Sequence, residues 1–122
     1  MVYYLAGPMR GCHEYNFPNF FKAEKALEKM GHVAINPARH DKNLGFDEKA
    51  GEVTQQYLRD AMAWDLGQVC RADGVVVLVG WRSSKGARAE VATARAIGLP
   101  VYILVSRAGE DPFLREAHYV GA

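Results

Sequence analysis

The sequence predicts a small doubly wound α/β fold, and two observations support this prediction. Residues 75–79 form an unbroken apolar run between glycines, which is typical of a strand buried on both faces of a parallel sheet. Elsewhere, short apolar runs alternate with longer segments whose apolar residues recur at helical spacing. This alternation builds open sheets with helices on both faces, so we expect about four parallel strands in a Rossmann-like or flavodoxin-like arrangement.

The expected elements follow one another in regular order along the chain. We expect strands over residues 2–5, 32–36, 75–79 and 100–105, and helices over residues 16–30, 54–71, 87–97 and 113–118. The first helix begins where Asn16 can cap it, and Gly31 ends it. Residues 37–53 are polar and glycine-spotted, so we expect a lid or substrate-specificity loop there, with a plain surface excursion as an equally weighted alternative.

Length and charge indicate one domain that binds a small ligand. The chain has 122 residues, of which 49% are hydrophobic, and this suits a single domain over residues 1–122. Its 15 basic and 14 acidic residues give a net charge of +1 and form no block of like charge. An electrostatic footprint for a nucleic acid polymer is therefore missing, and a small molecule is the expected partner.

The apolar segments and the cysteines predict a cytoplasmic protein. The N-terminal segment has no basic region, and no apolar run approaches the roughly 20 residues of a membrane span. We therefore expect no contact with a membrane. Cys12 and Cys70 are too few and too far apart for a disulfide framework or a zinc site, so we expect two free thiols.

Several common site motifs are missing from the sequence. The loop of residues 7–11 is not a dinucleotide-binding G-x-G-x-x-G. Lys85 precedes Gly86 and no hydroxyl residue follows, which excludes a nucleoside triphosphatase P-loop. The histidines are scattered without the spacing of metal ligands. We therefore expect neither a metal nor an organic cofactor.

Two carboxylates lie on the inward faces of expected helices. At about 100° per residue, Asp65 falls on the shoulder of one apolar stripe and Glu90 close to the middle of another. The helix dipole near Glu90 favours its carboxylate form, which a nucleophile or electrostatic stabiliser needs. The plainer alternatives are a structural partner for Asp65 and a surface role at the helix start for Glu90; the inward phase of Glu90 argues against the second.

Two loops at the ends of expected strands could hold an anion. Arg10 follows the first strand, and its planar guanidinium suits phosphate or carboxylate. Ser84, Lys85 and the amides near Gly86 precede a helix, where free N–H groups favour an anion. A solvated arginine is an equally weighted alternative for Arg10, and a plain basic surface loop is the alternative for the second segment.

Three motifs give the chain a resemblance to a known family. They are Tyr4-Leu5-Ala6-Gly7-Pro8-Met9-Arg10-Gly11, then Asp65-Leu66 ahead of Ala72-Asp73-Gly74-Val75-Val76-Val77, then Ser84-Lys85-Gly86-Ala87-Arg88-Ala89-Glu90. In order and spacing they resemble the nucleoside 2-deoxyribosyltransferase superfamily over residues 2–102. The resemblance is strongest to small phage and bacterial members related to the 2'-deoxynucleoside 5'-phosphate N-hydrolases.

The resemblance implies an enzyme that cleaves the N-glycosidic bond of a 2'-deoxynucleoside or its 5'-monophosphate. Glu90 matches the family's nucleophile, which forms a covalent glutamyl-sugar intermediate, and Asp65 matches the acid that assists it. Arg10 and Ser84 match positions that hold the 5'-phosphate. With the loop positions above, the expected substrate-binding residues are Tyr4, Gly7, Arg10, Trp81, Ser84 and Gly86. Hydrolysis and transfer to a second base both fit.

The resemblance also implies a homodimer or a higher homo-oligomer. The short chain and the apolar residues Trp81, Phe113 and Tyr119, which we expect to be exposed, agree with that expectation. Two other functions compete with the enzyme, because a fold does not fix a function. One is a non-catalytic nucleotide sensor or binding module, and the other is an interaction protein; release of free base would separate the enzyme from both.

Overall fold

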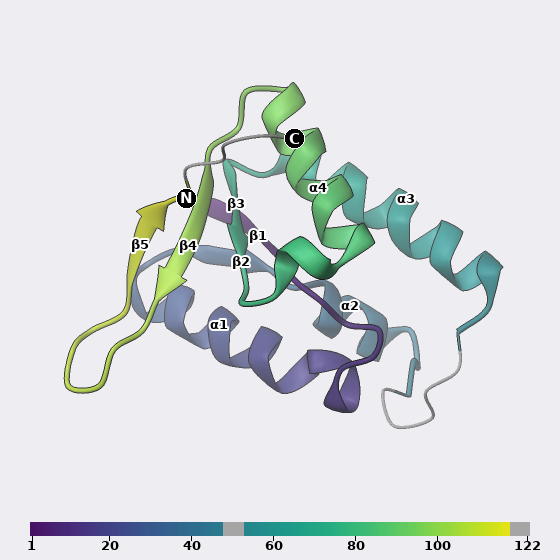
Figure 1. The fold of residues 1–122 in the computed structure, drawn as a ribbon, viewed down its shortest axis with the longest axis horizontal. Coiled ribbons are helices and arrows are strands. Elements are labelled where there is room, and N and C mark those ends of the chain that lie inside the picture. Colours follow the sequence, from purple (N-terminus) through teal and green to yellow (C-terminus); the bar gives the residue numbers. More distant parts are fainter. Residues whose placement is uncertain (48–52, 118–122) are drawn as a thin grey trace.

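The computed structural model describes residues 1–47 and 53–117 and contains one five-stranded sheet in the order β2-β1-β3-β4-β5 (Figure 1). The strands are β1 (Val2–Ala6), β2 (Val33–Ile35), β3 (Gly74–Val77), β4 (Val101–Val105) and β5 (Phe113–Glu116). The helices are α1 (Phe17–Lys29), α2 (Pro37–Asn43), α3 (Gln55–Arg71) and α4 (Lys85–Ala96), with short 3₁₀ turns η1 (His13–Asn16) and η2 (Trp81–Ser83).

The sheet is doubly wound, as predicted. Strands β2, β1, β3 and β4 run parallel, and β5 pairs antiparallel with β4. From β1 the chain first adds β2 on one side and later adds β3 on the other side. The strand order therefore reverses between β1 and β3, and the carboxyl ends of these two strands form the usual ligand crevice of such folds.

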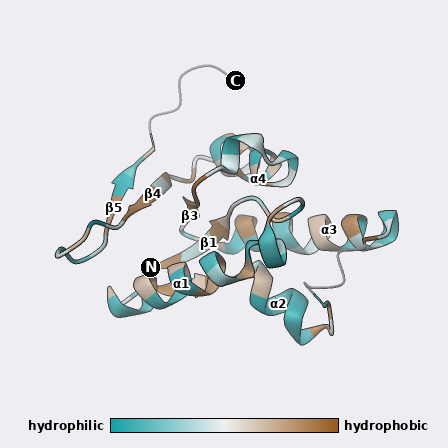
Figure 2. Ribbon diagram, turned by 60° about the horizontal axis from the view of Figure 1, so that its bottom comes forward, coloured by the Kyte–Doolittle hydropathy of each residue, from teal (hydrophilic) through white to brown (hydrophobic). Residues whose placement is uncertain are grey.

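Alternate residues of the strands feed two separate cores. Tyr4, Ala6, Val75 and Val77 pack with Val69 of α3 and with Ala87, Val91 and Ala94 of α4. Tyr3, Leu5, Val76 and Leu78 pack with Phe17, Phe20, Ala23 and Leu27 of α1 and with Ala38 of α2. In Figure 2, β3 and β4 are largely brown, whereas each helix carries both teal and brown residues. The sheet is thus covered on both faces, which explains why its central strands β1 and β3 carry no charged residue.

Side-chain caps fix where three helices begin. The Asn36 side chain accepts a hydrogen bond from the Ala38 amide at 2.9 Å and so starts α2. Thr54 caps α3 through the Tyr57 amide, and Ser84 caps α4 through the Ala87 amide at 3.1 Å. Each cap satisfies an amide that the first turn of a helix leaves without a partner.

The start of α1 differs from the expected cap. Asn16 precedes the helix, but its side chain makes no capping hydrogen bond and its φ of 62° is left-handed. The Asn16 side-chain amide nitrogen instead donates to the backbone carbonyl of Pro8 at 2.9 Å. Glu14 and Tyr15 also have positive φ, of 49° and 51°, so η1 is a left-handed turn. Asn16 therefore fastens the β1 loop to α1.

The prediction of a loop over residues 37–53 is wrong for the first part of this segment, because Pro37–Asn43 form α2. The sequence signal for this helix is an asparagine cap, Asn36, followed by a proline in the first turn. The polar composition of the segment concealed that signal. Ala38 is fully buried, and the Arg39 guanidinium holds the buried Glu24 of α1 with an Nε–Oε2 distance of 3.0 Å. Of the rest of the predicted lid, residues 48–52 lie outside the described residues.

The predicted C-terminal helix over residues 113–118 is also wrong. Phe113–Glu116 form β5, whose Leu114 pairs with Leu104 of β4, so edge pairing overrides the local helix-start signal of Asp111-Pro112. His118 lies outside the described residues.

Of the three apolar residues expected on the surface, one is buried, one is exposed and one lies outside the described residues. Trp81 is buried, at 8% exposure, among residues of β3 and α4, whereas Phe113 is exposed; Tyr119 lies outside the described residues. None of the described helices is long and apolar enough to cross a membrane.

The contact between Gly7 and Leu78 gives a stability prediction. A Cβ on Gly7 would lie 2.8 Å from the Leu78 Cβ, which is held by the backbone of the neighbouring chain segment. Gly7→Ala should therefore lower the free energy of unfolding by about 1–3 kcal/mol. Gly67→Ala is the matched control, because its Cβ meets only the tip of Arg71 at 3.8 Å inside α3. That control should raise stability by about 0.5–1 kcal/mol. Equal urea midpoints for the two variants would contradict the prediction.

Candidate active site

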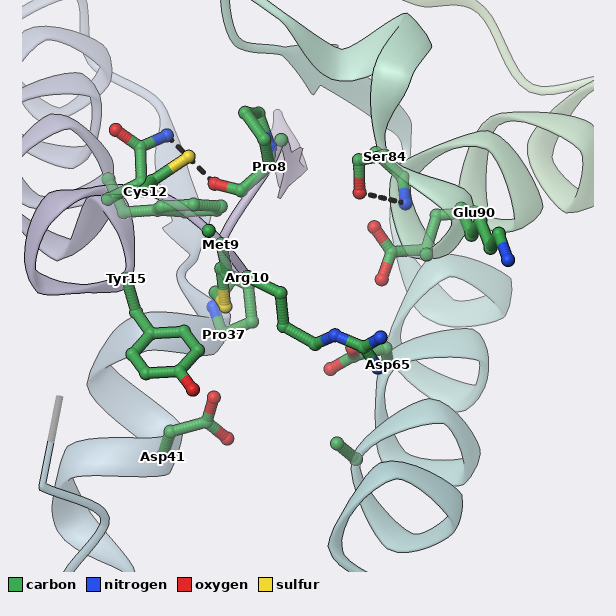
Figure 3. Close-up of a pocket in the computed structure, with 18 of the residues that line it drawn as sticks. Pro8, Met9, Arg10, Cys12, Tyr15, Pro37, Asp41, Asp65, Ser84 and Glu90 are labelled. Atoms are coloured by element: carbon green, nitrogen blue, oxygen red, sulfur yellow. Dashed lines mark hydrogen bonds between the residues drawn. The ribbon is translucent and has the colours of Figure 1, made fainter. Parts of the chain in front are cut away.

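A cleft of about 890 Å³ opens where β1 and β3 end, and it has the size of a small-molecule site. Its lining comes from the loop after β1, η1, α2, α3 and the segment that joins β3 to α4. Figure 3 views this cleft with Tyr15 and Asp41 on one wall and Ser84 and Glu90 on the other. The topology thus places the cleft at the expected crevice between β1 and β3.

A pair of carboxyl groups lies at the base of the cleft. Glu90 is on the second turn of α4, on the same face as the buried Ala87 and Val91, and is 5% exposed. Asp65 reaches the cleft from α3 and shares a side-chain hydrogen bond with Glu90. The Tyr4 hydroxyl of β1 donates to Glu90 Oε2 at 2.9 Å. The inward orientation predicted for both carboxylates is confirmed.

Burial controls the charge of this pair. Desolvation raises the pKa of Asp65 to about 6, with the Asp41 charge adding to it. Desolvation and the Asp65 charge raise the pKa of Glu90 well above its ordinary value, against the lowering effect of the Tyr4 hydrogen bond. The dipole of α4 was expected to keep Glu90 ionised, but burial next to a second carboxyl has the larger effect. We therefore assign one shared proton to the pair in the unliganded protein.

The expected anion-binding residues lie around the same cleft. Arg10, Ser84, Lys85 and Gly86 all line it, as does Gly7. Arg10 is exposed, has no ion pair among the residues that the structure describes, and extends across the cleft in Figure 3. The Ser84 oxygen already accepts from the Ala87 amide, which leaves its hydroxyl hydrogen for a ligand.

Two of the expected substrate-binding residues do not line the cleft. Tyr4 is fully buried behind Glu90 and contacts the site only through its hydroxyl. Trp81 lies beside a second hollow at the ends of β3 and β4, with the Arg82 guanidinium 5.6 Å from its ring centre. The Tyr4 position supports Glu90, whereas the Trp81 position gives no contact with the cleft.

Sequence reasoning missed a polar and aromatic wall. Asp41 of α2 is 6% exposed, lines the cleft and shares a side-chain hydrogen bond with Tyr57 of α3. Phe46 stacks on Tyr57, and Tyr15 meets Phe46 edge-on. The available signal was the asparagine-proline start of α2, since a helix from residue 37 would have given Asp41 a defined face.

The described residues contain no evident metal centre. Over residues 1–47 and 53–117, no group of three or more histidine, cysteine, aspartate or glutamate residues is arranged to hold a metal ion. Cys12 and Cys70 are free thiols, and Cys12 lines the cleft.

The fold and the cleft define an α/β domain with a cleft of small-molecule size at its topological switch point. The chain belongs to the DUF4406 family, described as a domain of unknown function, whose model matches residues 1–103. The match runs from β1 into β4 and includes both Asp65 and Glu90. No curated protein matches the chain.

The shared proton predicts how stability depends on pH. The folded pKa values of Asp65 and Glu90 lie above their ordinary values of 3.8 and 4.5. The native state therefore binds more protons than the unfolded chain as pH rises from those values toward the raised ones. Over that window the free energy of unfolding falls, by at most about 1.4 kcal/mol per pH unit for each proton.

Glu90→Gln should remove the part of this slope that Glu90 contributes, while Asp65 keeps its own part because desolvation is the largest cause of its raised pKa. The variant should be more stable than the wild type above about pH 7. Urea unfolding across the pH range measures the effect. Asp60→Asn is the matched control, because Asp60 is exposed on α3 and accepts a hydrogen bond from the Gln56 side chain at 2.9 Å. Parallel curves for wild type and Glu90→Gln would rule out the shared proton.

Proposed function

We propose that the protein cleaves the N-glycosidic bond of a 2'-deoxynucleoside or its 5'-monophosphate, as an N-glycosidase or a deoxyribosyltransferase. The observation that carries the proposal is the buried Glu90–Asp65 pair, held by Tyr4 at the base of a cleft of nucleotide size. The resemblance to the nucleoside 2-deoxyribosyltransferase superfamily supports the same chemistry. The Arg10 and Ser84 positions favour a substrate that carries an anion.

The proposed first step uses both carboxyl groups. A sugar that enters between Asp65 and Glu90 breaks their hydrogen bond, and the shared proton goes to Asp65. The Tyr4 hydrogen bond, which lowers the pKa of Glu90, favours this distribution. The Glu90 carboxylate then attacks C1' while the electron pair of the C1'–N bond passes to the base. Asp65 gives its proton to that base nitrogen. The products are a neutral base and an ester between Glu90 and the deoxyribosyl group.

The second step regenerates the pair. Asp65, now a carboxylate, takes a proton from a water or an incoming base, whose oxygen or nitrogen attacks C1'. The ester bond breaks, and its electron pair returns to Glu90. The Tyr4 hydroxyl, which donates to Glu90 Oε2, stabilises the negative charge of Glu90 before attack and after release.

A non-catalytic nucleotide sensor is the second candidate. The observation in its favour is the raised pKa of Glu90, because a neutral carboxyl is a hydrogen-bond donor and a poor nucleophile. Stabilisation by nucleotides without release of base from any of them would support the sensor over the enzyme.

The proposed enzymatic function predicts that the variant Glu90→Gln loses base release but keeps substrate binding. This change keeps the side-chain volume and removes the attacking oxygen, so base release should slow by about three orders of magnitude or more while binding persists. Mass spectrometry of wild type quenched with a slow substrate should find one deoxyribosyl group on the peptide that carries Glu90. Asp60→Asn, on the exposed side of α3, should keep full activity. A Glu90→Gln variant that releases base near the wild-type rate would exclude Glu90 as the nucleophile.

If Arg10 binds the 5'-phosphate, its removal should weaken the binding of monophosphates in particular. Arg10→Ala should weaken binding of a 5'-monophosphate by about 1.5–3 kcal/mol, and binding of the matching nucleoside much less, because only the charged contact is lost. Isothermal titration with Glu90→Gln as the background isolates binding from turnover. Arg88→Ala is the control, since Arg88 is exposed on α4 and does not line the cleft. Equal losses for nucleoside and monophosphate would remove Arg10 from the phosphate site.

A further inference from the structure

The Asp41–Tyr57 pair has no part in the proposed chemistry, yet it is built into the cleft. Asp41 is 6% exposed, lines the cleft and is hydrogen-bonded to Tyr57. Burial is the largest influence on its pKa and raises it, while the Tyr57 hydrogen bond favours the carboxylate. A carboxyl group buried at this cost, on the wall of a binding cleft, needs a polar partner.

Aromatic rings surround this pair on one side. The Phe46 and Tyr57 rings stack with centroids 4.9 Å apart and an angle of 18° between their planes. The Tyr15 ring meets Phe46 edge-on at 5.2 Å. Together with Pro37 these side chains form an apolar wall of the cleft. Such a wall suits a flat heteroaromatic ring.

Electrostatics orients a nucleotide within the cleft. Ser84 and Lys85 line it at the start of α4, and Arg10 lines it from the loop after β1. All three side chains favour a phosphate. Asp41 would repel a phosphate. The charge of Asp41 raises the pKa of both Asp65 and Glu90, and the charge of Asp65 raises that of Tyr57. The Asp41–Tyr57 pair therefore lies close enough to Asp65, the acid that protonates the leaving base, for their charges to interact.

We propose that Asp41 and Tyr57 recognise the base of the substrate and select bases that carry an exocyclic amino group, namely adenine, cytosine and guanine, over thymine and uracil. This inference rests on the proposed function and names its substrate class. Tyr57 occupies part of the Asp41 carboxylate, whose remaining lone pairs can only accept. Adenine, cytosine and guanine offer an amino group to them. Thymine and uracil offer one N–H between two carbonyl oxygens, and those oxygens would face the carboxylate.

The test compares base release from the 5'-monophosphates of deoxyadenosine, deoxycytidine, deoxyguanosine, thymidine and deoxyuridine. Wild type should have a kcat/KM about tenfold or more higher on at least one amino-bearing substrate than on either oxo substrate. Asp41→Asn keeps the volume and adds N–H donors that suit carbonyl oxygens. It should reduce that ratio about tenfold or invert it. Asp60→Asn, whose carboxyl is exposed on α3, should leave the ratio unchanged.

The ratio is an internal measure, so partial loss of folded Asp41→Asn protein does not alter it. A wild-type ratio near one, or an unchanged ratio in Asp41→Asn, overturns the inference and leaves the glycosidase standing. If wild type releases no base at all, the proposed function fails, and binding of the same five monophosphates to wild type and Asp41→Asn decides the inference. Preference for amino-bearing nucleotides that Asp41→Asn removes supports it; equal binding, or no binding of any of them, overturns it.

Discussion

The hydrogen bond from the Tyr4 hydroxyl to Glu90 joins the middle of the sheet to the helix that follows β3. Tyr4 is fully buried and Glu90 is 5% exposed, so the bond between them helps both polar groups to avoid the cost of an unpaired buried atom. The contact requires β1 beside β3 and α4 packed over both. The Ser84 cap sets where α4 starts and hence where Glu90 points. The site is therefore a product of the core and cannot be moved without repacking it.

The second constraint is electrostatic, because the site combines acidic groups with a low-dielectric environment. Burial raises the pKa of both Asp65 and Glu90; the Asp65 charge raises that of Glu90 further, and the Asp41 charge adds to both. Cationic residues stand at the mouth, where Arg10 is exposed to solvent. A ligand with an anionic end and a neutral, polar ring complements this distribution better than a uniformly charged one.

The parallel strands and the inward carboxylates could be predicted because both follow from periodicity. A buried parallel strand is recognised in a sequence as an apolar run. The direction of Glu90 on its helix follows from the rotation of about 100° per residue. Its raised pKa could not be predicted, because that shift depends on the depth of burial and on the second carboxyl that α3 places beside it. β5 was missed since pairing with β4 is a tertiary effect. Asp41 was missed because the polar composition of residues 37–53 concealed α2.

The left-handed turn η1 restricts which sequences can form this wall of the cleft. Glu14, Tyr15 and Asn16 all have positive φ, a conformation that costs L-residues other than glycine and asparagine about 1–2 kcal/mol each. The ring contact between Tyr15 and Phe46 and the bond from Asn16 to the Pro8 carbonyl hold the turn in place. Glycine or asparagine is thus acceptable at position 14, whereas β-branched residues are disfavoured at all three positions. Random mutagenesis aimed at new ligands should therefore find few tolerated substitutions in η1. It should find more among the exposed side chains of the opposite wall.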